Sequence, residues 1–193
     1  MKKTTYILLS LTLIFTLILS GCGVKPDVNA KAFLDALKAQ DMSKASSFMK
    51  KDGSKGEFKY DSPEQEKMIK AVFSKIDYKL DESTVKGDNA TIKAKITSID
   101  LMRVSNKMIS ELMPTLMAQA LSGDKPDEKK QNEMMLQYMV NSINDPNAPK
   151  TQTDVTLELV KDGNQWLVKP TDDLLNALTG NYDKMANSWG NKK

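Results

Sequence analysis

The sequence predicts an α+β fold in which N-terminal helices cover one face of an antiparallel sheet and a helical hairpin interrupts that sheet. Apolar residues recur at helical spacing before residue 77 and change to period-two alternation after it. The alternation returns after residue 153, and both alternating regions contain a turn with glycine beside aspartate. Because alternation gives each strand one apolar face, the sheet needs cover on one side, and the early helices are the natural cover.

The chain begins with a segment that is typical of secretion. Two lysines precede an apolar run of about fourteen residues, which ends in Leu19-Ser20-Gly21-Cys22. A transmembrane helix needs roughly 20 apolar residues, so the run has the length of a signal-peptide core. The segment resembles a bacterial lipoprotein signal peptide that ends in a lipobox. The resemblance implies that residues 1–21 are a signal peptide, that cleavage falls between Gly21 and Cys22, and that a diacylglycerol is attached to the Cys22 thiol.

This leader predicts where the mature protein resides. We expect an extracytoplasmic protein anchored to the cell membrane by the lipid on Cys22, since more than one acyl chain holds a protein stably on a bilayer. Residues 22–26 are then a lipidated tether, residues 27–180 a single α+β domain and residues 181–193 a polar C-terminal tail. Three alternatives stay open: ordinary secretion, a retained N-terminal anchor, and a buried core position for Cys22.

Composition excludes several classes of active site. The chain contains no histidine, and Cys22 is its single cysteine. These absences exclude Ser-His-Asp and Cys-His catalysis, zinc sites of histidine and cysteine, and disulfide bonds. Removal of the leader lowers the net formal charge from +3 to +1, so no overall field attracts nucleic acid. The sequence contains no phosphate-binding loop and no EF-hand loop. We therefore expect no cofactor, no metal and no nucleic-acid partner.

Three helices are predicted before the sheet. The first is expected to begin with Asp27 as its N-cap and the second with Asp41. The third begins at Ser62-Pro63, where serine suits the N-cap and proline the first helical position. A polar loop over residues 50–56 is expected between the second and third helices. The expected buried faces are Val28, Phe33, Ala36 and Leu37; Ala45, Phe48 and Met49; and Met68, Ile69, Val72, Phe73 and Ile76.

Two hairpins and a closing helix complete the predicted domain. The first hairpin is expected to turn at residues 86–89 and the second at Asp162-Gly163, a strong hairpin signal. Thr171 is expected to cap the last helix, and Gly180 to end it. The expected buried residues are Tyr78, Leu80, Ile92, Ala94 and Ile96; Val155, Leu157, Leu159, Trp166 and Val168; and Leu174, Leu175 and Leu178. For Trp166, a pocket wall is the alternative to the core.

The segment between the hairpins, about residues 102–150, has the pattern of two helices joined near residues 122–126. Pro114 lies inside the first helix and is expected to kink or restart it. The methionines Met113 and Met117, and likewise Met135 and Met139, are four residues apart, so each pair can face one way. They either pack the helical hairpin against the sheet or form an adaptable apolar groove for a ligand or partner helix. Copper(I) binding by thioethers is a third chemical option.

The order of these elements resembles a known group of domains. Three segments carry the resemblance: FLDALKAQDM at 33–42, VKDGNQWLV at 160–168 and LLNALTG at 174–180. They resemble the cystatin-like or nuclear-transport-factor-2-like α+β domains of lipoproteins from Gram-positive bacteria, many of which are domains of unknown function. The resemblance implies a long, curved antiparallel sheet around helices, often with a cone-shaped pocket that the helical insert could plug or roof. It supplies no catalytic residue.

These observations predict a non-catalytic module that binds a small apolar ligand or another protein of the cell envelope. Two other functions stay open: a cofactor-free enzyme that uses carboxylate or tyrosine chemistry in a cone-shaped pocket, and a structural accessory subunit. The groove residues that we name are Met113, Met117, Met135 and Met139. Caps, first helical turns and solvated faces account for the acids, so we name no catalytic residue.

Overall fold

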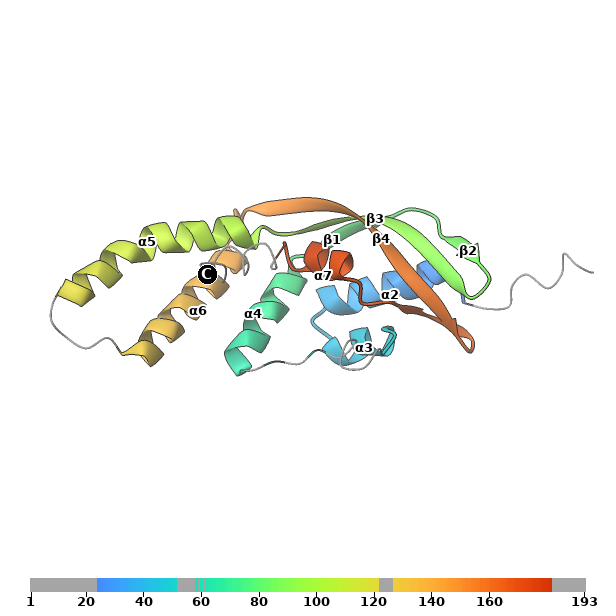
Figure 1. Cartoon of the computed structure of the whole chain (residues 1–193), viewed down its shortest axis with the longest axis horizontal. Coiled ribbons are helices and arrows are strands. Elements are labelled where there is room, and N and C mark those ends of the chain that lie inside the picture. The colour runs from blue at the N-terminus through green and yellow to red at the C-terminus, as the bar shows by residue number, and fades with distance from the viewer. Residues whose placement is uncertain (1–23, 52–57, 59, 61, 122–126, 182–193) are drawn as a thin grey trace, which may run out of the picture.

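The computed structural model describes residues 24–51, 58, 60, 62–121 and 127–181, and Figure 1 shows their arrangement. The described helices are α2 (Pro26–Lys38), α3 (Met42–Ser47), α4 (Pro63–Ser74), α5 (Leu101–Leu121), α6 (Glu128–Asn144) and α7 (Asp172–Leu178). The described strands are β1 (Asp77–Leu80), β2 (Thr84–Lys86), β3 (Asn89–Ile99), β4 (Lys150–Asp162) and β5 (Gln165–Val168). The predicted α+β fold, with N-terminal helices on an antiparallel sheet and a helical hairpin between strands, is confirmed.

The five strands form one antiparallel sheet. The order of the strands across the sheet is β1, β3, β4 and β5. β2 pairs with the same edge of β3 as β1 does. β3 and β4 pair from Asn89↔Val160 at one end to Ile99↔Lys150 at the other. The sheet curves over α2, α3 and α7 (Figure 1). Along β3, buried and exposed residues alternate from Asn89 to Ile96, as the sequence pattern predicts.

The main hydrophobic core lies between the curved sheet and the helices α2, α3 and α7. Alternate residues of β3 and β4 meet one stripe of each helix there, and burial of each large side chain stabilises the fold by roughly 1.5–3 kcal/mol. Trp166 is 6% exposed in this core, as predicted. The largest fully buried side chains of this core are Phe33, Leu34, Leu37, Ile76, Ile92, Ile96, Leu157, Leu159, Leu174 and Leu178.

The first helix begins earlier than the sequence predicts. Lys25 occupies the N-cap position and Pro26 the first helical position, so Asp27 lies in the first turn and the predicted Asp27 cap is wrong. Proline favours the start because its fixed φ suits a helix and it lacks the N–H that would be left without a partner. Val28 is 56% exposed, so its predicted place in the buried stripe is also wrong.

Side-chain caps begin the other short helices as predicted. The Asp41 carboxylate accepts a hydrogen bond from the Lys44 N–H at 2.9 Å, and the Ser62 hydroxyl accepts one from the Gln65 N–H at 3.1 Å. The Thr171 hydroxyl accepts from the Leu174 N–H at 3.3 Å. The second helix ends at Ser47, before Phe48 and Met49, and Met49 instead forms a parallel bridge with Val168 of β5. Most of the predicted loop at 50–56 lies outside the described residues.

The predicted hairpin turns are confirmed at Gly87 and Gly163, both with φ near +60°. The strand before the first turn is the short β2, which the sequence did not reveal as a separate strand. β1, with Tyr78 and Leu80, pairs with the far half of β3, where Tyr78 lies opposite Ile96. All three residues of β2 are exposed, so this strand shows no alternation of buried and exposed residues. The sequence pattern therefore did not reveal it.

The helical insert leaves the sheet at one end. The Asp100 N–H donates to the Pro149 carbonyl at 2.8 Å, so the two ends of the insert are joined. α5 and α6 then pack on each other, and α6 packs on α4, beyond the end of the sheet (Figure 1). The insert therefore does not roof the concave side of the sheet. α5 continues through Pro114 without a restart, because a helix can bend around a missing hydrogen bond.

Gly180 fixes the end of α7 against the sheet. Its φ is +62°, and a Cβ atom built there would lie 1.7 Å from the Ile99 carbonyl oxygen. Both the backbone conformation and the close approach thus require glycine, and the predicted helix end at Gly180 is confirmed.

We predict that Gly180→Ala destabilises the fold far more than Gly163→Ala. Gly163 has nearly the same φ, +59°, but open space around its absent Cβ, so alanine there adds backbone strain alone. We expect a loss of about 1–2 kcal/mol in the free energy of unfolding for Gly163→Ala and at least about 3 kcal/mol for Gly180→Ala. Urea denaturation measures both, and equal losses would contradict the proposed close packing against Ile99.

Candidate functional site

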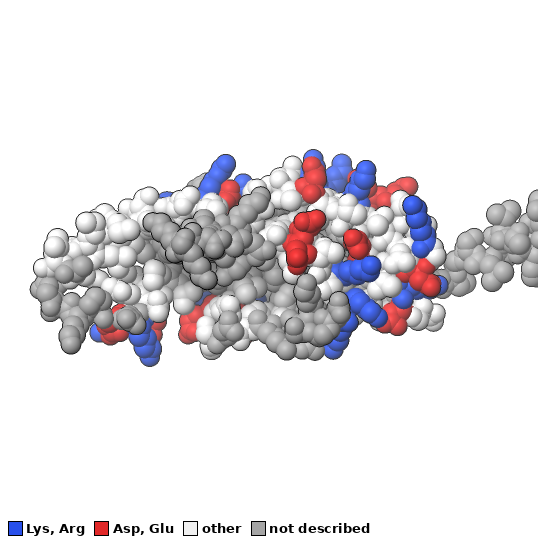
Figure 2. Space-filling view, viewed as in Figure 1, with Lys and Arg blue, Asp and Glu red and all other residues white. Residues whose placement is uncertain are grey.

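An exposed apolar stripe follows the outer half of α5. Ile109, Met113, Met117 and Leu121 are 37%, 46%, 59% and 84% exposed, respectively. They are four residues apart, so they follow one another along one side of the helix. We call these four residues the α5 stripe. Residues 112–121 contain no charged residue, and Figure 2 shows a mostly uncharged surface over this end of the molecule.

The neighbouring face of α5 is held in a second hydrophobic core. Met108 is buried in this core, which also includes Val72 of α4 and Ile143 of α6. The Tyr138 hydroxyl of α6 donates a hydrogen bond to the Glu111 carboxylate of α5, and this bond raises the pKa of Tyr138. These contacts fix the rotation of α5 about its axis. The α5 stripe is consequently held outward, because the buried face cannot turn away from α4 and α6.

The four methionines predicted to form a groove occupy different environments. Met113 and Met117 belong to the exposed α5 stripe. Met139 of α6 is 7% exposed in the second core, and Met135 is partly buried against the same core. The sequence did not single out Ile109 and Leu121, because α5 carries apolar residues on two adjoining faces. Spacing alone does not tell which of those faces meets the rest of the protein.

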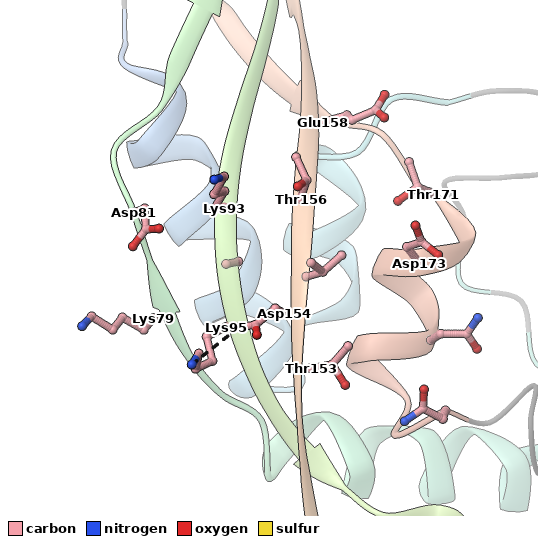
Figure 3. Close-up of a pocket in the computed structure, with 14 residues that line it drawn as sticks. Lys79, Asp81, Lys93, Lys95, Thr153, Asp154, Thr156, Glu158, Thr171 and Asp173 are labelled. Atoms are coloured by element: carbon pink, nitrogen blue, oxygen red, sulfur yellow. Dashed lines mark ion pairs between the residues drawn. The ribbon is translucent and has the colours of Figure 1, made fainter.

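A second feature is an open groove over the outer face of the sheet and the edge of β4. Its volume is about 1000 Å³. Side chains from β1, β3, β4 and α7 surround it (Figure 3). Its lysines come from β1 and β3, whereas the side chains from β4 and α7 include Asp154, Glu158 and Asp173. Lys95 of β3 lies 3.6 Å from Asp154, which is the ion pair drawn in Figure 3.

This groove differs from the expected cone-shaped pocket. The concave side of the sheet is filled by the main core, with Phe33, Ile92 and Leu174 fully buried there. The groove instead lies outside the core and has polar walls. It was missed because alternation predicts polar residues on the outer face without showing how much of β4 is covered by β5. Among the described residues, the buried polar side chains are Asn29, Ser98 and Ser105.

Charged and phenolic groups connect α2 to β1. Asp35 accepts a hydrogen bond from the Tyr78 hydroxyl and forms a 2.6 Å ion pair with Lys31. Lys38 lies 3.2 Å from Asp77. Partial burial and the hydrogen bond to Asp35 together raise the pKa of Tyr78 to about 12, while the bond from Lys31 lowers the pKa of Asp35. The phenol of Tyr78 is therefore protonated at neutral pH and serves as a hydrogen-bond donor between two elements of the fold.

Two absences hold for the part of the chain that the structure describes. No group of three or more histidine, cysteine, aspartate or glutamate residues there is placed to hold a metal ion. No helix within those residues combines the length and the apolar character needed to cross a membrane.

Comparison with known proteins gives one structural likeness. No protein-family model matches the chain, and no curated protein matches it. A crystal structure of the Bacillus subtilis strain 168 protein ycdA, described as a candidate lipoprotein, aligns with it at 12% sequence identity and a TM-score of 0.47. The alignment covers 76% of this chain and 44% of that protein. This chain therefore aligns with less than half the length of ycdA.

We predict that the stabilising effect of Tyr78 is lost at alkaline pH. The pKa of Tyr78 is raised in the folded state from an unfolded value of about 10, so folding favours the protonated phenol. Its contribution is then fully present below pH 10 and falls as the pH rises from about 10 to about 12. The difference in unfolding free energy between wild type and Tyr78→Phe should shrink over this interval. A constant difference from pH 8 to pH 11.5 in urea denaturation would rule this out.

Proposed function

We propose that this protein is a lipid-anchored lipoprotein of the extracytoplasmic membrane surface that binds a second protein through the α5 stripe. The observation that carries the proposal is the α5 stripe itself, four exposed apolar residues of which Met113, Met117 and Leu121 lie in the uncharged stretch 112–121. Contiguous apolar surface on a folded protein is typical of an interaction site. The proposed anchor rests on the sequence Leu19-Ser20-Gly21-Cys22, which lies outside the described residues.

The start of the described chain, which follows the proposed anchor in sequence, and the α5 stripe lie at different ends of the described part of the molecule (Figure 1). Val24, the first described residue, lies two residues before the start of α2, and α2 begins at the end of the sheet where β2 lies (Figure 1). The outer half of α5 lies at the opposite end (Figure 1). This separation favours a protein partner over the anchoring bilayer as the occupant of the α5 stripe.

The chemistry of the α5 stripe favours an apolar helical partner. A row with spacing four on one helix can pack into the groove between rows on another helix. Met113 and Met117 have flexible, polarisable side chains that adapt to an irregular partner surface. A charged partner surface would lose its hydration here without gaining an ion pair, because residues 112–121 carry no charge. A partner helix with its own apolar stripe satisfies both conditions.

The other functions considered have less to support them. A small apolar ligand needs an apolar cavity, whereas the described groove is open and has polar walls. The hydroxyl of Tyr78 is engaged with Asp35, which gives the enzymatic alternative no free phenol at that position. A structural accessory subunit would use the same α5 stripe toward a permanent partner, so the experiment below also applies to it.

We predict that Met113→Lys with Met117→Lys abolishes partner contact. A photo-activated cross-linker placed at Ile109 in native membranes should join the wild-type α5 stripe to an apolar helix of another protein, as mapped by mass spectrometry. Two buried lysines without partners would prevent this contact. The matched control is Thr115→Lys with Ala118→Lys, two exposed α5 positions outside the α5 stripe, which should keep the cross-link.

Circular dichroism should show unchanged helix content in both variants, because all four positions are exposed. Cross-links that go to lipid, or that persist in the double methionine variant, would refute protein binding by the α5 stripe.

We predict that Cys22 carries a thioether-linked diacylglycerol. Intact-mass analysis of membrane extracts should find a mature chain that starts at Cys22 with the mass of this group added. Cys22→Ser should lack the modification, whereas Ser20→Ala should retain it because both residues are small. A free Cys22 thiol that reacts with maleimide in membranes would disprove the anchor.

A further inference from the structure

One edge of the sheet is covered over only part of its length. β4 pairs with β3 along residues 150–160, but on its other side β5 pairs only with Leu159–Asp162. The stretch of β4 before Glu158 thus has a strand neighbour on one side only among the described residues. An edge of this kind presents backbone N–H and C=O groups that can pair with another strand.

Two backbone hydrogen bonds show which residues present these groups. The Lys161 N–H donates to Asp88 beside β3, whereas the Glu158 carbonyl accepts from Lys169 on the opposite side, both at 2.8 Å. Backbone groups of successive strand residues point to opposite sides, so every second residue from Glu158 points away from β3. The backbone groups of Gln152, Asp154 and Thr156 therefore face the uncovered edge. Within the described chain, no backbone hydrogen bond satisfies them there.

The groove described above runs along this edge. Figure 3 shows Asp154 and Thr156 on β4, with Thr171 and Asp173 across from them at α7. α7 also contributes Asn176, whose buried side-chain oxygen has no hydrogen-bond partner. The edge thus combines backbone groups on one wall with a side-chain acceptor on the other. Such an arrangement suits an extended chain, which offers N–H groups on both of its sides.

The charges along the edge select the side chains of that extended chain. The groove residues that come from β4 and α7 include three acids and no base. Asp154 and Glu158 lie on the same outer face with Thr156 between them, and Asp173 is exposed on α7. Side chains directly opposite on paired strands attract each other when their charges differ. Lys95 lies 3.6 Å from Asp154 and Lys169 lies 3.4 Å from Glu158, but the two acidic side chains remain 82% and 49% exposed. Exposed ion pairs of this kind are weak, so basic residues at alternate positions of an added strand would still be attracted to Asp154 and Glu158.

We propose that the edge of β4 from Gln152 to Glu158, with α7 as the second wall, binds an extended basic peptide segment as an added strand. The peptide alternates lysine or arginine toward the outer face with small or apolar residues toward Thr153 and Val155. This site is independent of the α5 stripe, since the two share no residue. It follows the general mode in which an extended peptide extends a sheet at its free edge.

A synthetic peptide of alternating lysine and valine, labelled with a fluorophore, tests the site with the full-length lipidated protein in an uncharged detergent. Fluorescence anisotropy measures the dissociation constant. We expect saturable binding to the wild type and at least roughly tenfold weaker binding to the variant Asp154→Lys with Glu158→Lys. The control Glu82→Lys with Asp88→Lys makes the same charge change at exposed positions away from this edge and should bind within about twofold of wild type.

Two further measurements separate strand addition from simple charge attraction. Bound peptide should slow hydrogen exchange of the Asp154 and Thr156 amides, since both N–H groups would become paired. Two versions of the same peptide would carry methyl groups on alternate backbone nitrogens, one on the odd-numbered residues and the other on the even-numbered residues. The version whose methyl groups lie on the edge that pairs with β4 should bind at least roughly tenfold more weakly than the other version.

No saturable binding, equal binding of wild type and Asp154→Lys/Glu158→Lys, equal binding of both methylated peptides, or unchanged amide exchange would each overturn the proposal. Substitutions in the α5 stripe should leave peptide binding unchanged. A failure at the α5 stripe and a failure at the β4 edge are therefore distinguishable.

Discussion

The structure depends on the long pairing of β3 with β4. These strands are separated in sequence by the whole helical insert, yet they pair from Asn89↔Val160 to Ile99↔Lys150. Their inner faces supply Ile92, Ile96, Leu157 and Leu159 to the main core, so the pairing register decides which residues are buried. The pairing also brings the two ends of the insert together, and the hydrogen bond from Asp100 to Pro149 closes them.

Several other elements meet at the Ile99 end of this pairing. Gly180 at the end of α7 approaches the Ile99 carbonyl oxygen, and α5 begins at Leu101 immediately after β3. The second core then fixes α5 through Met108 and Ile143 and leaves the α5 stripe in solvent. On the other side, the short β5 pairs only with Leu159–Asp162, so among the described residues the rest of β4 has no second strand neighbour. Both proposed binding surfaces are thus consequences of where this one strand pair begins and ends.

Local chemistry made much of this fold predictable. The helix caps at Ser62 and Thr171 and the turn at Asp162-Gly163 involve only residues that are close in sequence. Their structure is therefore predictable from the local sequence alone. Asp27 failed as a cap because the helix begins at Pro26, two residues before the start that an Asp27 cap would give. β2 carried no burial alternation and was missed. The fold class followed from the spacing of apolar residues, since that spacing differs between helices and strands.

The candidate surfaces were predictable only in part, because both depend on contacts between distant segments. The richness in methionine pointed to Met113 and Met117. Ile109 and Leu121 are recognised as part of an exposed stripe only from the structure, in which the other face of α5 belongs to the second core. Met135 and Met139 have the same spacing and face the core, which no local rule distinguishes. The uncovered edge of β4 likewise follows from the length of β5 and not from any residue of β4 itself.

Hydroxyl-radical footprinting of the methionines tests the central claim, protein binding by the α5 stripe, most directly. Oxidation of Met113 and Met117 would be compared between native membranes and the purified protein, with the buried Met139 as the internal reference for an intact fold. If the α5 stripe binds a protein, both methionines should be strongly protected from oxidation in membranes. That protection should be lost after digestion of the partner with a protease that leaves the purified domain of this protein intact. Equal oxidation of Met113 and Met117 in both preparations, with Met139 unreactive, would contradict it.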